Sequence, residues 1–355
     1  MELKQREFFK KLSTTPSITG HEELIGEVIR DYAKDFADDI RTDVMENVII
    51  GKNTQAPFRV MLAGHCDQIG LTVQYIDEQG YIYVIDRGGW DIQNLIGQHV
   101  IVWAKSGPIP GVIGRKPIHI LKPEERKQVP SMSDIWIDVG ASKAEEVTSK
   151  VRVGDPISLK STYSELWNDR IACMAADDRT GVWVVLEAMR RADPSKLKCA
   201  VYSVATVQEE AGMRGAEAAI YSVNPHIAIA VDVTHATDVP SVDKRQQGDL
   251  QVGKGAIIER GPNTCTAVED LMIETAEKNA IPYQIETHSE NTHTDAYVMQ
   301  VARGGVATGL LSIPNRYMHS PVELFSMEDL DGAADLLARF LESLDENSPL
   351  FFQKY

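Results

Sequence analysis

The feature that most constrains the fold is a repeated alternation of short apolar runs and amphipathic stretches in the second half of the chain. The apolar runs have the composition of strands buried on both faces, and the stretches between them repeat apolar residues at helical spacing. We expect strands at 199–207, 226–233, 283–287 and 306–313, and helices at 182–190, 216–222, 269–279, 296–303 and 327–344. Such alternation predicts a mostly parallel sheet with helices on both faces.

The pattern changes between residues 71 and 161. Short β-type runs at 81–85, 99–103 and 134–138 are separated by turn signals, with no long amphipathic helix between them. We therefore expect an inserted all-β, barrel-like domain at 71–161, in which the polar stretch 122–127 is a loop. Residues 1–70 and 162–355 would form the interrupted α/β domain, beginning with two helices and a strand at 47–50 and continuing with a buried strand at 59–64.

Charge and cysteine usage exclude several classes of protein. The chain has 52 acidic and 36 basic residues, for a formal net charge of −16, which disfavours nucleic acid and anionic membrane surfaces as partners. Its four cysteines form no CxxC pair, so neither a disulfide framework nor a zinc knuckle is expected. The charged amino terminus and the lack of a long apolar stretch lead us to expect a cytoplasmic protein without a membrane segment.

Acidic residues and histidines gather where the predicted strands end, which is where open α/β sheets bind ligands. His65 and Asp67 follow the strand at 59–64 and project to the same side of an extended chain. One of them can therefore bind a metal while the other acts next to that ligand without binding the metal. A strand-end histidine and a capping aspartate are the alternative. Asp177 and Asp178 precede an apolar helix, where an N-cap is one explanation and a carboxylate bridging two cations is the other.

Three further segments show the same placement. Glu209 and Glu210 follow the strand at 199–207, which permits one metal ligand and one general base, although a solvated loop is the alternative. Asp232 lies near the end of a buried run, where an uncompensated charge costs several kcal/mol, so coordination is favoured. His319 lies just beyond the strand at 306–313, and a lone loop histidine of this kind is usually structural. The remaining histidines are expected to be structural or exposed: His21, His99, His119, His226, His235, His288 and His293.

The candidate metal ligands share nitrogen and oxygen donors without a thiolate. They are His65, Asp177, Glu210, Asp232 and His319. Such a set suits Zn, Co or Mn, and two metals sharing one carboxylate account for every member. Glu209 and Asp67 remain as acids that do not coordinate a metal.

The motifs in which these residues occur resemble those of metallopeptidase family 42, the di-zinc aminopeptidases that include glutamyl aminopeptidases, deblocking aminopeptidases and TET peptidases. The resemblance covers nearly the whole chain, through segments 17–20, 65–70, 88–91, 177–179, 208–212, 232–234, 294–296 and 316–321. It implies that His65 and Asp232 hold one metal, that Glu210 and His319 hold the other, and that Asp177 bridges them next to a cis peptide with Asp178. It further implies that Glu209 is the general base and that Asp67 orients His65.

The chain departs from the family pattern at two places, and neither removes an implied ligand. Gln68 stands where the family usually has Glu, and the segment 291–293 stands where it has glycines, a change that could reshape the substrate pocket. The resemblance implies a phosphorylase/hydrolase-like catalytic domain, an inserted domain used for dimerisation and assembly, and a homo-oligomer ranging from a dimer to a hollow dodecamer.

The expected activity is hydrolysis of the amino-terminal residue from peptides with a free N-terminus. In this hypothesis two divalent metal ions per subunit, Zn with Co or Mn as alternatives, activate a water molecule whose proton Glu209 accepts. Another di-metal amide hydrolase, such as a carboxypeptidase or a deacylase, is the main alternative. A glycosidase using Glu209 and Asp67 as its carboxylate pair, or a non-catalytic peptide-binding protein, would also fit parts of the pattern.

Overall fold

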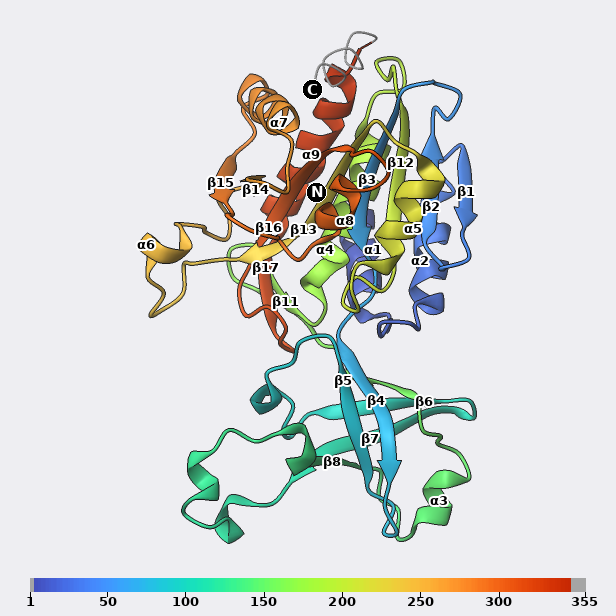
Figure 1. Ribbon diagram of the computed structural model, residues 1–355, viewed down its shortest axis with the longest axis vertical. Helices are drawn as coiled ribbons and strands as arrows, with labels where there is room; N and C mark the ends of the chain where they lie inside the picture. The colour runs from blue at the N-terminus through green and yellow to red at the C-terminus, as the bar shows by residue number, and fades with distance from the viewer. Residues whose placement is uncertain (1–2, 346–355) are drawn as a thin grey trace.

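A computed structural model describes residues 3–345 of the chain as an α/β body joined to a β-barrel (Figure 1). The body is built on an eight-stranded sheet with the order β1-β2-β12-β3-β13-β16-β14-β15. Its strands are β1 (Asp39–Thr42), β2 (Val48–Lys52), β3 (Arg59–His65), β12 (Ala200–Thr206), β13 (Ile227–His235), β14 (Ala256–Arg260), β15 (Tyr283–Thr287) and β16 (Ala307–Asn315). The α/β fold expected from the alternating pattern is therefore confirmed.

The centre of the sheet is parallel, whereas both flanks contain antiparallel pairs. Strands β12, β3, β13 and β16 run in one direction, while β2 is antiparallel to β12 and β14 is antiparallel to β16. The antiparallel pair β1–β2 was not anticipated. It forms because only a short turn joins these two strands, and a parallel pair needs a long crossover connection.

Helices cover both faces of the sheet, and alternate residues of the strands supply the two cores. Val60 and Leu62 pack on one side with residues from α1, α2, α4, α7 and α9, and Met61 and Ala63 pack on the other side with residues from α5 and α8. The helices are α1 (Leu3–Thr14), α2 (Glu23–Ala33), α4 (Ala176–Arg191), α5 (Arg214–Val223), α6 (Lys244–Gln247), α7 (Thr266–Lys278), α8 (Asp295–Gln300) and α9 (Met327–Ser343). Among residues 3–345, no helix is both long enough and apolar enough to cross a membrane.

The inserted all-β segment closes into a barrel with the strand order β4-β5-β8-β7-β6-β9 and a hydrophobic core of its own. Its strands are β4 (Gly70–Ile76), β5 (Ile82–Arg87), β6 (His99–Ala104), β7 (Gly107–Arg115), β8 (Ile135–Asp138) and β9 (Pro156–Leu159), accompanied by the short helix α3 (Ala144–Thr148). The barrel expected from the sequence is thus confirmed, although the loop predicted at 122–127 contains a turn of 3-10 helix, Glu125–Lys127.

A small three-stranded sheet, which the sequence did not reveal, lies between the α/β body and the barrel (Figure 1). It consists of β10 (Tyr163–Leu166), β11 (Arg170–Cys173) and β17 (Glu323–Ser326). Its central strand β11 pairs with β17, which places Glu323 opposite Cys173, a few residues before α4 begins. The segment that follows β16 is thereby fixed beside the start of α4.

Candidate active site

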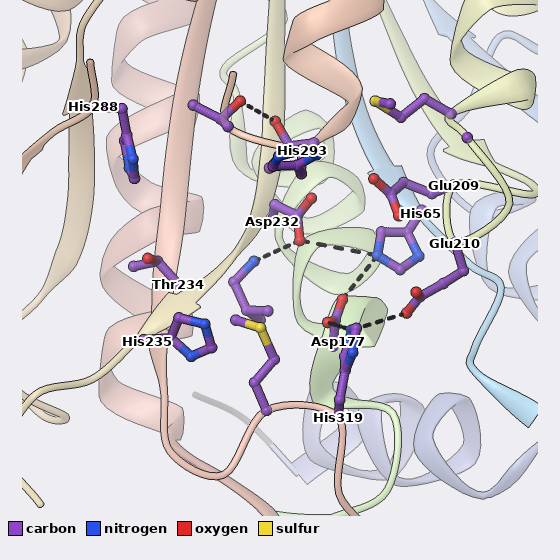
Figure 2. Close-up of a pocket in the computed structure, with 16 residues that line it drawn as sticks. His65, Asp177, Glu209, Glu210, Asp232, Thr234, His235, His288, His293 and His319 are labelled. Carbon is purple, nitrogen blue, oxygen red and sulfur yellow. Dashed lines mark hydrogen bonds and ion pairs between the residues drawn. The ribbon is translucent and has the colours of Figure 1, made fainter. Parts of the chain in front are cut away.

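The residues expected to carry the chemistry surround one cavity of about 450 Å³ at the carboxyl ends of the central strands (Figure 2). The five candidate ligands and Glu209 all line it: His65, Asp177, Glu209, Glu210, Asp232 and His319. Asp67 is fully buried behind the cavity wall. Segments that are far apart along the chain are therefore brought together as the sequence predicted.

Asp177 lies at the centre of this arrangement. Its Oδ1 is 2.9 Å from Nε2 of His65, and its Oδ2 is 3.3 Å from Nε2 of His319. Nε2 of His65 is also 3.9 Å from Oδ1 of Asp232, and Nε2 of His319 is 3.5 Å from Oε1 of Glu210. Each oxygen of one carboxylate thus faces a different imidazole, and each imidazole has a second carboxylate nearby.

Close backbone contact between β3 and α4 brings Asp177 next to His65. A Cβ atom on Gly64 would lie 2.5 Å from the carbonyl carbon of Gly181, so only glycine permits this approach. Oδ2 of Asp178 accepts a hydrogen bond from the backbone N–H of His65 at 3.1 Å, and its Oδ1 accepts one from the N–H of Gly181 at 2.8 Å. The capping alternative therefore describes Asp178, whereas Asp177, joined to it by a cis peptide bond, faces the two histidines.

Asp67 fixes the positions of Glu209 and Glu210 by accepting hydrogen bonds from their backbone N–H groups. Its Oδ1 accepts a hydrogen bond from the N–H of Glu209 at 3.0 Å, and its Oδ2 accepts bonds from the N–H of Glu210 at 3.2 Å and from Oγ1 of Thr19 at 2.9 Å. Oδ1 also lies 3.4 Å from Nδ1 of His65. Because Asp67 is buried and fully engaged, it cannot approach a sugar substrate as the glycosidase alternative would require.

Glu323 is a supporting residue that sequence reasoning missed. Its Oε2 accepts a hydrogen bond from the backbone N–H of Asp177 at 3.1 Å, and its Oε1 accepts one from the N–H of His319 at 2.8 Å. One buried carboxylate therefore fixes the backbone of two candidate ligands. The only available signal was its position four residues after His319, because a glutamate in a short strand otherwise resembles a surface residue.

The cavity concentrates acidic groups in a low-dielectric environment. Burial raises the pKa values of Asp232 and Glu209 well above their usual range, and neighbouring carboxylates raise them further. Burial also opposes ionisation of Asp177, but hydrogen bonds with His319 and His65 outweigh it and lower the pKa of Asp177. The same contact with Asp177, together with one to Glu210, raises the pKa of His319 to about 11. Two imidazoles are thus the main positive partners of several crowded carboxylates.

This donor set fits divalent metal ions. Ligand atoms of His65, Asp177 and Glu210 lie within 4.8 Å of one another, as do those of His65, Asp178 and Asp232. Nitrogen and oxygen donors without thiolate suit Zn, Co or Mn, and divalent ions would offset the repulsion among the carboxylates. Nδ1 of His65, which is buried, has no hydrogen-bond partner despite its proximity to Asp67.

Three histidines that were expected to be structural or exposed also line the cavity: His235, His288 and His293. In Figure 2, His235 and His288 lie across the cavity from His65 and Glu210. Threonine and methionine side chains also line the cavity: Met213, Thr234, Thr292, Thr294 and Met318. The sequence carried only weak signals for these histidines, such as the position of His293 beside Thr294 and Asp295.

Comparisons with known proteins agree with this geometry. Residues 46–336 match the M42 glutamyl aminopeptidase family. The lysyl aminopeptidase of Pyrococcus furiosus is 38% identical over 344 residues, which cover 95% of this chain and 97% of that protein. Among solved structures, a TET aminopeptidase from a marine sediment archaeon of the Thaumarchaeota superposes with a TM-score of 0.93 at 33% identity, covering 98% of this chain and 99% of that chain.

The TET1 peptidase of Pyrococcus horikoshii, described as assembling into a tetrahedron or a large octahedral shell, superposes with a TM-score of 0.85 at 31% identity, covering 96% of this chain and 100% of that chain. The family match spans most of the sequence, and the similarity extends over both the α/β body and the barrel. The chain therefore belongs to the M42 glutamyl aminopeptidase family and is a metal-dependent aminopeptidase.

Proposed function

We propose that this aminopeptidase uses a pair of divalent metal ions to remove the first residue from peptides with a free N-terminus. His65 and Asp232 would hold one ion, Glu210 and His319 the other, and Asp177 both. The observation that carries the proposal is that the two oxygens of Asp177 face the two histidines separately. Zinc is the metal we favour, with Co and Mn as alternatives that the same donors accommodate.

Glu209 is the residue we assign as general base. When bound, a pair of divalent ions lowers the pKa of water and polarises the scissile carbonyl. Glu209 lines the cavity but belongs to neither of the two groups of potential metal ligands that include His65. Its carboxylate is therefore free to take a proton and deliver it to the leaving amine. Asp67 fixes its position by accepting a hydrogen bond from its backbone N–H.

The names of the relatives support an aminopeptidase over a carboxypeptidase built on the same metal pair. Two divalent ions would balance the four carboxylates that line the cavity, so the charge of the cavity alone does not select an ammonium group over a C-terminal carboxylate. The relatives named lysyl aminopeptidase and glutamyl aminopeptidase favour removal of the first residue from a free N-terminus.

We further propose that the chain forms a homo-oligomer and that residues 71–161 act as a separate domain in its assembly. The shells described for the TET1 peptidase support this. So do the exposed apolar side chains of Ile118, Ile120 and Val129, which lie in the segment between β7 and β8 of the barrel. Sedimentation velocity of the full chain tests the assembly state. Cytoplasmic localisation stays a prediction.

The Glu209→Gln variant tests the proposed mechanism. Because Gln keeps the size of the side chain but cannot accept the proton, turnover of aminoacyl fluorogenic substrates should fall by about 10²- to 10⁴-fold while the bound metal per chain stays at the wild-type level. Glu217→Gln, on the exposed side of α5, is the matched control and should retain full activity. Near-wild-type turnover in Glu209→Gln would show that another group accepts the proton.

A further inference from the structure

A second group of potential metal ligands lies outside the five candidate ligands described above. One donor atom from each of Glu259, Glu286 and His288 lies within 4.8 Å of the others. Glu259 is almost completely buried, Glu286 is partly buried, and His288 lines the wall of the active-site cavity. The group shares no residue with the proposed dinuclear centre.

The sheet itself forces the two glutamates together. Strands β14 and β15 are parallel, and their register places Glu259 directly opposite Glu286. His288 follows β15 by one residue, and its N–H continues the ladder by donating to the carbonyl of Arg260 at 3.1 Å. Residues two apart on an extended chain face the same side, so His288 joins the two carboxylates on one face. Like charges in directly opposed positions are destabilising unless a positive group lies between them.

The described contacts only partly compensate these charges. Nε2 of His288 is 2.8 Å from Oε2 of Glu259 and 3.7 Å from Oε2 of Glu286, and Oγ1 of Thr234 donates a hydrogen bond to the latter oxygen at 2.9 Å. Oε2 of Glu259 is nevertheless buried and accepts no regular hydrogen bond, so its described polar contact is the 2.8 Å ion pair with His288. A single imidazole carries at most one positive charge, against two negative charges on the carboxylates.

We propose that Glu259, Glu286 and His288 bind an additional divalent cation. Two carboxylates and a neutral imidazole would balance such an ion in charge, and the buried Oε2 of Glu259 would gain a ligand bond. Two oxygen donors and one nitrogen donor without thiolate suit Zn, Co or Mn. The ion would enter from the active-site cavity, where His288 is about one-third exposed.

The position of this site indicates a structural role. The cation would tie β14 to β15, and through Glu286 and Thr234 it would tie both to β13, the strand that carries Asp232. It would act by neutralising charge at the edge of the sheet rather than by contacting the substrate. The inference does not depend on the proposed mechanism, because removing the dinuclear centre should leave this site intact.

Metal content measured by elemental analysis tests the proposal. Chelator-treated chains are reloaded with Zn²⁺, desalted and compared. Glu286→Gln and His288→Ala should each retain one equivalent fewer than wild type, whereas Glu274→Gln, an exposed change on α7, should retain the wild-type amount. The proposal is overturned if both site variants bind as much Zn²⁺ as wild type, which would mean that the three side chains form only an internal ion-pair network.

A second measurement separates this site from the catalytic metals. In an Asp177→Asn background, which disables the proposed bridging ligand, adding Zn²⁺ should still raise the Tm, and the further change Glu286→Gln should make that rise smaller. Because His288→Ala alters a partly exposed side chain, it provides the same comparison if Glu286→Gln folds poorly. An equal rise in Tm with and without the Glu286 or His288 change would contradict the site.

Discussion

The contact between Gly64 and α4 gives a prediction whose size follows from the structure. In Gly64→Ala, the new Cβ would lie 2.5 Å from the carbonyl carbon of Gly181, whereas ordinary contact begins near 3.4 Å. The start of α4 must therefore retreat by about 0.9 Å, the difference between these distances. The 3.1 Å hydrogen bond from the N–H of His65 to Asp178 would then stretch to about 4 Å and be lost.

The expected cost combines two effects. Overpacking against backbone costs about 1–3 kcal/mol, and losing a buried hydrogen bond to a carboxylate costs roughly 1.5–3 kcal/mol. We therefore expect the free energy of unfolding to fall by about 3 kcal/mol or more. Because Asp177 and His65 separate by the same shift, turnover should also fall by about 10²-fold.

Urea unfolding followed by circular dichroism, together with steady-state kinetics, measures both effects. Gly304→Ala is the matched control, because nothing lies within 4 Å of the added Cβ and Gly304 is outside the left-handed region. It should change stability by less than about 0.5 kcal/mol. If Gly64→Ala behaved like this control in both measurements, the claim that backbone contact between β3 and α4 positions the site would be wrong.

Three further predictions follow from buried charges and from the metal centre. Gln68→Glu should raise the free energy of unfolding by about 1 kcal/mol at pH 7, measured by urea unfolding, because Gln68 Oε1 accepts a 2.9 Å hydrogen bond from the fully buried Arg179 and a carboxylate would strengthen it. Burial raises the pKa of Asp329 to about 6, so its protonated form is favoured in the folded state; this contribution is present at low pH and is lost as pH rises from about 4 to 6. The stability difference between wild type and Asp329→Asn in metal-free protein should change by ~3 kcal/mol across that range, and a flat difference would contradict the assignment. Chelation should abolish peptidase activity while circular dichroism shows a folded chain, and Zn, Co or Mn should restore activity; unfolding on chelation would instead indicate that the metals hold the fold.

Much of the fold was predictable because hydrophobic periodicity is a local property. The buried runs that became β12, β13 and β16 and the barrel strands β5, β6 and β8 could be identified without knowing their partners. The antiparallel pairs β2–β12 and β14–β16 and the pairing of β11 with β17 could not, because pairing between distant segments leaves no trace in either segment alone. The pair β11–β17, for example, joins residues that are separated by about 150 positions in the chain.

The site residues likewise divide into those that a local pattern predicts and those that depend on tertiary structure. His65, Glu210, Asp232 and His319 were recognisable because each stands at or near the end of a strand, where a charged side chain needs a partner, and Asp177 because it stands at the start of the apolar helix α4 beside a second aspartate. Glu323 and Asp178 act by accepting hydrogen bonds from the backbone of other site residues, and that role depends on tertiary geometry. The sequence does not single out His288, because its glutamate partners come from the pairing of β14 with β15, which no local pattern reveals.

Anomalous diffraction from crystals of the zinc-loaded protein tests the central claim most directly. Besides the peak expected at Glu259, Glu286 and His288, two peaks are predicted among the five candidate ligands, one beside His65 and Asp232 and one beside Glu210 and His319, with Asp177 in contact with both. A single peak among these five ligands, or peaks that leave Asp177 without a metal, would contradict the bridging role on which the proposed mechanism depends.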